Sequence, residues 1–206
     1  MRTTRGARSV TRWASFGSVM LIAALTAKAA DLPAGWFAAG SHPAEYQMGI
    51  DTTVHHDGKA SGFIKANASE LHGFGTLMQT AAPGDYRGKR LRLSGYVRSE
   101  KVQSGWAGLW LRIDGPTQAA TRQPEMLGFD NMQSRPIKGT TDGTRYEIVL
   151  DVPNTAVALA YGVLLNGDGA VWLDELKFEV VPSTVPLTGM SSPGPGRGPQ
   201  NLDFEK

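Results

Sequence analysis

The chain has 206 residues with 21 basic and 19 acidic side chains, a formal net charge of +2, and no cysteine. The lack of cysteine excludes a disulfide framework, thiolate chemistry and a lipidated N-terminal cysteine. The 25 glycines and 12 prolines favour many turns over long helices.

Residues 1–29 have the three parts of a cleavable secretory signal. Four arginines and Lys28 make the segment basic, and no acidic residue precedes Asp31. The apolar stretch from Trp13 to Leu25 is too short to span a bilayer. The small-residue sequence Ala27-Lys28-Ala29 that follows is typical of a cleavage site. We therefore expect export to the periplasm or the medium, with no integral membrane segment after cleavage; an uncleaved N-terminal anchor is the alternative.

Removal of the predicted signal changes the sign of the net charge. The remaining residues, 30–206, carry 16 basic and 19 acidic side chains, a net charge of −3. The basic character of the whole chain thus belongs to the signal, and it gives no support for a nucleic-acid partner.

Residues 30–181 predict one all-β domain, because short period-two alternation recurs between turns rich in Gly, Pro, Asp and Asn. In chain order, the expected strands are 45–51, 61–67, 73–81, 88–102, 106–114, 145–152, 157–165 and 170–180. Their number and spacing are typical of sandwiches and jelly rolls. The predicted fold class is therefore an all-β jelly-roll β-sandwich of about eight antiparallel strands.

The segments between these strands supply the turns and loops. The turn at 55–59 joins the first two strands, and Asn166-Gly167-Asp168-Gly169 favours a hairpin between the last two. Residues 116–143 are polar and predict long loops with a short strand near 126–132. Residues 182–206 are expected to form a Pro/Gly-rich tail, in which residues 201–205 either dock on the domain as a strand or form a disordered end.

The predicted strand at 106–114 presents a row of side chains suited to ligand binding. Ala107, Leu109, Leu111 and Ile113 form its core face, while Trp106, Trp110 and Arg112 lie on the other face. Aromatic rings stack on the CH faces of sugars, and a guanidinium donates to hydroxyls. The alternative is that a second layer covers this face and both tryptophans are core residues.

A polar loop at 129–138 is the second candidate. It concentrates Asp130, Asn131, Gln133 and Arg135, and loops at the edge of a sandwich often carry binding residues. We predict that these four side chains form the rim of a binding platform made by Trp106, Trp110 and Arg112. A solvated loop without a binding role is the alternative.

Metal and catalytic motifs are weak. The four histidines show no zinc-ligand spacing, and adjacent His55 and His56 point in opposite directions. The residue spacing does not specifically indicate a structural calcium site with Asp174 or Asp203 as a ligand. No nucleophile motif or phosphate-binding motif occurs in its required context. No catalytic residue, metal or cofactor is therefore predicted.

Two expected strands resemble those of carbohydrate-binding modules and galactose-binding-like jelly rolls. The segments are Leu91-Arg92-Leu93-Ser94-Gly95-Tyr96-Val97-Arg98 and Val171-Trp172-Leu173-Asp174-Glu175-Leu176-Lys177-Phe178. The C-terminal Asn201-Leu202-Asp203-Phe204-Glu205 is similar to the segment that usually begins such a module. These short motifs imply the fold more than any ligand.

A closer resemblance covers Gly35 to Val181. Its segments include Ala39-Gly40-Ser41-His42-Pro43, Gly73-Phe74-Gly75-Thr76-Leu77-Met78-Gln79, Trp106-Ala107-Gly108-Leu109-Trp110 and 129–141. They resemble an uncharacterised bacterial domain family found alone or behind a helix-turn-helix in transcriptional regulators. The resemblance implies a sensing or binding role. Related sequences tend to have Trp where this chain has Gly143, which puts an aromatic contact there in doubt.

Three functions are consistent with the sequence. The leading hypothesis is an exported, non-catalytic module that binds a glycan or another small molecule. The second is a structural protein that packs its sheet surface on an envelope partner. The third is a small hydrolase of envelope carbohydrate that acts through paired carboxylates. Binding is expected more than catalysis, because no particular carboxylate pair stands out in the sequence.

Overall fold

The computed structural model describes residues 32–191. The predicted signal at 1–29 and the predicted docking strand at 201–205 lie outside the described residues. The strands are β1 (Phe37–Gly40), β2 (Tyr46–Asp51), β3 (Ser61–Ala66), β4 (Phe74–Ala81), β5 (Lys89–Thr117), β6 (Pro124–Asp130), β7 (Ile137–Val152), β8 (Ala158–Asn166), β9 (Ala170–Val181) and β10 (Met190–Ser191), with two short 3-10 helices, η1 (Pro43–Glu45) and η2 (Gly84–Tyr86). Neither helix is long or apolar enough to cross a membrane.

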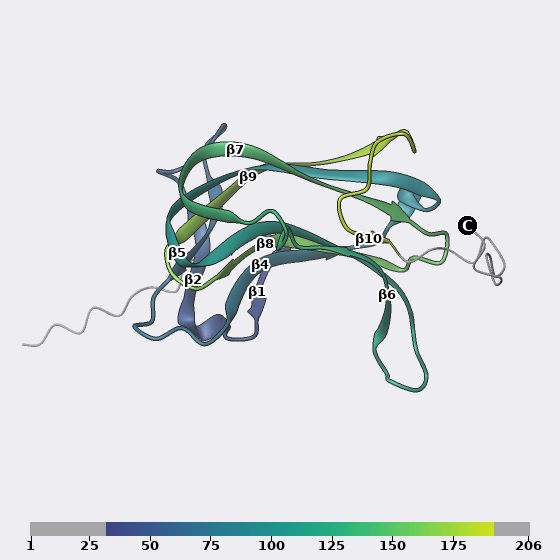
Figure 1. Ribbon diagram of the computed structural model, residues 1–206, viewed down its shortest axis with the longest axis horizontal. Helices are drawn as coiled ribbons and strands as arrows, with labels where there is room; N and C mark the ends of the chain where they lie inside the picture. Colours follow the sequence, from purple (N-terminus) through teal and green to yellow (C-terminus); the bar gives the residue numbers. More distant parts are fainter. Residues whose placement is uncertain (1–31, 192–206) are drawn as a thin grey trace, which may run out of the picture.

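All ten strands belong to one antiparallel sheet that folds over into two layers at the middle of β5 (Figure 1). The first half of β5 pairs with β7 and β9, and β9 continues through β3 to β2. The second half pairs with β6 and β8, and β8 continues through β4 to β1. The prediction of an all-β jelly-roll sandwich is confirmed. The eight expected strands correspond to seven observed ones, because two of them form β5; β6 matches the short strand expected near 126–132, and β1 and β10 were not expected.

The bend of β5 joins two strands that the sequence predicted separately at 88–102 and 106–114. Pairing with β7 shifts register three times between Val97 and Ala107, and Lys101 has a φ of 54°. At the bend, the Oδ1 atom of Asp168 accepts hydrogen bonds from the backbone N–H groups of Gln103 and Ser104, at 2.7 and 2.8 Å. The carboxylate thus pairs backbone donors that the register shifts leave without a strand partner.

Two expectations about connections are wrong. The turn at 166–169 does not close a hairpin, because β8 and β9 pair with opposite halves of β5 and the turn crosses between the layers. Residues 116–143 are not mostly loop, since β7 already begins at Ile137 and pairs with β5. Both errors have one cause: a single strand that spans two layers creates pairings that local turn chemistry does not encode.

The core lies between the layers and follows the alternation predicted for β5. Leu91, Leu93 and Val97 of the first half are fully buried, as are Leu109 and Leu111 of the second half. Burial of each such side chain stabilises the fold by about 2 kcal/mol. The same alternation turns Trp106, Trp110 and Arg112 to the outer face of the second layer.

Residues 182–191, the first part of the expected tail, lie on the sandwich. The Nη1 group of Arg90 donates to the backbone oxygens of Ser183 and Val185. The backbone N–H of Thr188 donates to Val149, and β10 then pairs with β6. The packed part of the domain therefore extends beyond residue 181.

Candidate ligand-binding groove

A groove of about 350 Å³ lies on the outer face of the second layer. Strand register builds it, because residues that pair across antiparallel strands point to the same face. Trp110 of β5 pairs with Gly162 of β8, which pairs with Met78 of β4. The lining residues are Ala39, Gly40, Phe74, Thr76, Met78, Trp106, Trp110, Arg112, Phe129, Asn131, Leu164 and Asn166.

Trp110 forms the buried wall of the groove. Its side chain points away from the core between the layers, yet the residue is only 7% exposed. The indole Nε1 donates to Thr76 Oγ1 at 2.8 Å, and this hydroxyl donates to the backbone oxygen of Val163 at 2.8 Å. Trp110 therefore lies on the outer face, as expected for a binding residue, but it is nearly buried and its N–H group is paired within the protein, as expected for a core residue.

Trp106 is the more accessible of the two tryptophans. It is half-buried and packs, with Phe74 and Phe129, around the small cluster that contains Trp110. Gly108 separates the tryptophans on the strand, and a Cβ atom there would lie 2.7 Å from the backbone oxygen of Asn131. Glycine thus lets the backbone after β6 approach the groove closely.

Arg112 is the one charged residue that lines the groove within residues 32–191. Its Nε and Nη2 groups donate to the two carboxylate oxygens of Asp114 at 2.8 and 2.9 Å. The two residues lie on the same face of β5, two positions apart. Their side chains differ in exposure: 41% for Arg112 and 8% for Asp114. The carboxylate therefore fixes the guanidinium at the groove surface.

Of the four predicted rim residues, one lines the groove and three do not. Asn131 lines the groove, whereas Asp130 and Arg135 pair with each other through two hydrogen bonds of 3.1 and 2.7 Å. Asp130 is 6% exposed and also accepts from the backbone N–H of Met132, so this pair holds the loop in shape. Gln133 is exposed and does not line the groove. The binding role of all seven predicted residues stays a prediction.

Several lining residues were not among those predicted from the sequence. Phe74 and Leu164 supply apolar walls, and Asn166 adds an amide at the end of β8. Period-two alternation places each of them on the non-core face of its strand. Their arrival beside Trp106 depends on the order of strands β4, β8 and β5, which only the folded chain provides.

A smaller cavity of about 160 Å³ lies on the outer face of the first layer. The ring of His56 stacks on Tyr96 with centroids 3.6 Å apart, and its Nδ1 atom lies 2.7 Å from Glu175 Oε2. Asp174 accepts from the backbone N–H groups of His56 and Asp57. The carboxylate considered for calcium is thus used to dock the β2–β3 loop. No group of three or more metal-binding side chains occurs in the part of the chain that the structure describes.

Asp51 lies at the edge of the same layer. Burial opposes its ionisation, but hydrogen bonds from Thr53, the Trp172 indole and backbone N–H groups outweigh this effect and hold the pKa of Asp51 well below its usual value. The Trp172 Nε1 atom lies 2.8 Å from Asp51 Oδ2. The ionised carboxylate therefore anchors an aromatic residue that is itself buried.

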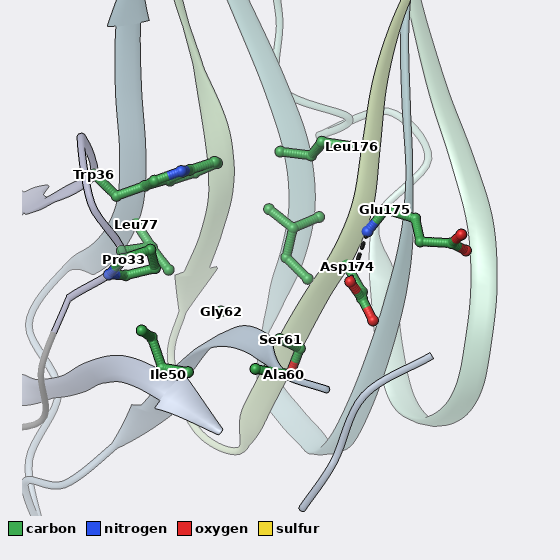
Figure 2. Close-up of a pocket in the computed structure, with 11 residues that line it drawn as sticks. Pro33, Trp36, Ile50, Ala60, Ser61, Gly62, Leu77, Asp174, Glu175 and Leu176 are labelled. Atoms are coloured by element: carbon green, nitrogen blue, oxygen red, sulfur yellow. Dashed lines mark hydrogen bonds between the residues drawn. The ribbon is translucent and has the colours of Figure 1, made fainter. Parts of the chain in front are cut away.

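A third cavity, of about 250 Å³, opens between the layers (Figure 2). Pro33, Trp36, Ile50 and Leu77 line one side of it, and Leu176 lies across from them. The side chain of Glu175 extends away from the apolar residues. None of the residues predicted from the sequence to bind a ligand lies here, and most of the lining side chains are apolar.

Solved structures share the β-sandwich class of this fold. The enzymatically active domain of tailspike protein 4 from bacteriophage CBA120 matches 72% of this chain over 20% of its own length, with a TM-score of 0.52 and 11% identity. The Stig cyclase Fisc from Fischerella sp. TAU matches 74% of this chain over 88% of its length, with a TM-score of 0.50 and 14% identity. A CBM22 xylan-binding domain from Paenibacillus barcinonensis has a TM-score of 0.49, with 14% identity, and covers 75% of this chain and 91% of its own. At 11% and 14% identity, the tailspike and cyclase matches show a similarity of fold alone.

Sequence comparison gives a nearer relative. No family model matches the chain. It is 43% identical, over 174 residues, to the uncharacterized HTH-type transcriptional regulator YbfP of Bacillus subtilis (strain 168). This homology covers 84% of the chain and 57% of the regulator, so the chain spans little more than half the length of its relative. The predicted relation to a domain of helix-turn-helix regulators is confirmed.

Proposed function

We propose that this protein is an exported, non-catalytic module that binds a glycan or another small molecule in the groove beside Trp106. The observation that carries the proposal is the composition of the groove: aromatic walls converge with a fixed guanidinium and two amides in one concavity. Apolar walls with a few placed polar groups are typical of small-molecule sites. A sensing role for the homologous part of the regulator is compatible with this proposal.

Catalysis is the less favoured function because of what the groove contains. Arg112 is the only charged side chain that lines it within residues 32–191, and the nearby Asp114 is paired with that arginine. Glycoside hydrolysis ordinarily needs two carboxylates that face the substrate. The described groove therefore supports recognition better than bond cleavage.

A screen of glycans and metabolites against the purified chain tests the binding role. We expect a ligand that raises the melting temperature and that binds the Trp106→Ala variant about 5- to 150-fold more weakly, because the variant loses an aromatic contact worth about 1–3 kcal/mol. Trp36→Ala is the matched control, since Trp36 is another half-buried indole but lines the cavity between the layers. No ligand in a broad screen, or equal losses in both variants, would refute the proposal.

Export is proposed from the sequence of residues 1–29 alone. Expression of the full chain in a bacterial host, followed by fractionation and intact mass measurement, tests it. We expect the exported fraction to hold a protein that lacks the first 29 or so residues. A full-length protein that stays in the cytoplasm would contradict the proposal without affecting the binding function.

A further inference from the structure

The groove has almost no net charge, although it contains an arginine. Nε and Nη2 of Arg112 donate to the two carboxylate oxygens of Asp114, at 2.8 and 2.9 Å. Such a bidentate pair occupies the Nε–Nη2 edge of the guanidinium, one of the two edges that an arginine can offer to a carboxylate or phosphate, and it places a compensating negative charge against the cation. No other charged side chain lines the groove in the described range. The buried Asp114 carboxylate therefore neutralises the positive charge of Arg112 at the groove surface.

The remaining groups of the groove also disfavour an anion. The faces of Trp106 and Phe129 carry the negative part of the aromatic quadrupole. The amides of Asn131 and Asn166 each offer both a donor and an acceptor, which matches a hydroxyl group, itself donor and acceptor. An anionic ligand would lose its hydration in the groove and be repelled by the Asp114 carboxylate behind the arginine.

We infer that Asp114 sets the charge selectivity of the groove, so that it takes neutral sugars and rejects their carboxylated or phosphorylated counterparts. This inference rests on the proposed binding function. Asp114 acts through Arg112 and is buried, so it is a specificity-determining residue that does not contact the ligand.

Calorimetry with matched oligosaccharides tests the inference. The probes are neutral oligosaccharides of glucose, xylose, mannose and galactose, and oligosaccharides of glucuronic and galacturonic acid. We expect the unmodified protein to bind one or more neutral probes with an affinity that changes less than about twofold between low and high salt. Acidic probes are expected to bind at least about tenfold more weakly, because a carboxylate would lose its hydration and lie near the like charge of Asp114.

The Asp114→Asn variant should remove most of this selectivity. It keeps an acceptor oxygen for Arg112 but leaves the guanidinium charge uncompensated, so acidic probes should gain about tenfold in affinity, and high salt should remove this gain. Asp151→Asn is the control: Asp151 pairs with Arg90 by the same two-bond geometry, at 2.8 and 2.9 Å, and neither residue lines the groove. It should leave the ratio of acidic to neutral affinity unchanged.

The outcomes separate this inference from the function on which it rests. Salt-dependent binding of acidic probes by the unmodified protein would overturn the charge selectivity while leaving the binding function intact, and this result needs no variant. An unchanged affinity ratio in folded Asp114→Asn would overturn the role of Asp114. Failure of every neutral and acidic probe, together with an unresponsive metabolite screen, would overturn the binding function and the inference with it.

Discussion

The hydrogen-bond chain behind Trp110 predicts that a buried hydroxyl stabilises the outer face of the second layer. The Thr76→Val substitution keeps the shape of the side chain but removes the acceptor of the Trp110 indole N–H and the donor to the Val163 oxygen. Thr76 and Trp110 are 4% and 7% exposed, so water replaces the lost partners poorly. A buried donor left unpaired costs about 1–3 kcal/mol. For a domain of this size, about 2 kcal/mol lowers the melting temperature by about 4–8 °C.

Urea unfolding followed by circular dichroism measures this effect, with Thr76→Ser as the control. Serine keeps the hydroxyl and loses only a methyl group, which costs about 1 kcal/mol when buried. We expect the valine variant to have the lower free energy of unfolding, with an unchanged dependence on urea. A valine variant as stable as the unmodified protein would refute the reasoning, because the hydrogen-bond chain would then contribute no net stabilisation.

Three further results are expected. The lowered pKa of Asp51 means that its ionised form stabilises the fold above the pKa of an unfolded aspartate, about 3.9. This contribution is lost as the pH falls below that value. The urea midpoint of Asp51→Asn should therefore fall less than that of the unmodified protein between about pH 5 and pH 2. Asp174→Ala should speed hydrogen exchange at the amides of His56 and Asp57, whereas Asp174→Asn, which keeps an acceptor, should change it less. A Cβ atom at Gly162 would lie 2.1 Å from a backbone oxygen of β4, so Gly162→Ala should lower the free energy of unfolding by about 1–3 kcal/mol or more, and a neutral effect in chemical denaturation would contradict this packing.

The faces of the strands were predictable from the sequence because side-chain alternation is local. Leu109 and Leu111 are buried between the layers, and Trp106 and Arg112 point away from them, as the period of two requires. The order of the strands was not predictable. A turn such as 166–169 carries the chemistry of a hairpin whether its two strands pair with each other or with opposite halves of β5.

The candidate site was predicted in part for the same reason. Alternation on one strand brought Trp106, Trp110 and Arg112 together, but the contribution of Phe74 and Asn166 depends on pairing between strands distant in the sequence. The pairing of Asp130 with Arg135 could not be predicted from the composition of the loop either. A cluster of charged residues in a loop looks the same in sequence whether the side chains face a ligand or each other.

Stability and recognition can be separated along the second half of β5. Its inward residues fill the core, while on its outward face Trp110 is paired to Thr76 and nearly buried, and Trp106 and Arg112 remain accessible to a ligand. Substitution of Trp110 should therefore cost mainly free energy of unfolding, since it removes a packed side chain and a paired N–H group. Substitution of Trp106 should cost mainly affinity. The buried indole thus holds the wall of the groove in place, while the accessible positions determine what the groove binds.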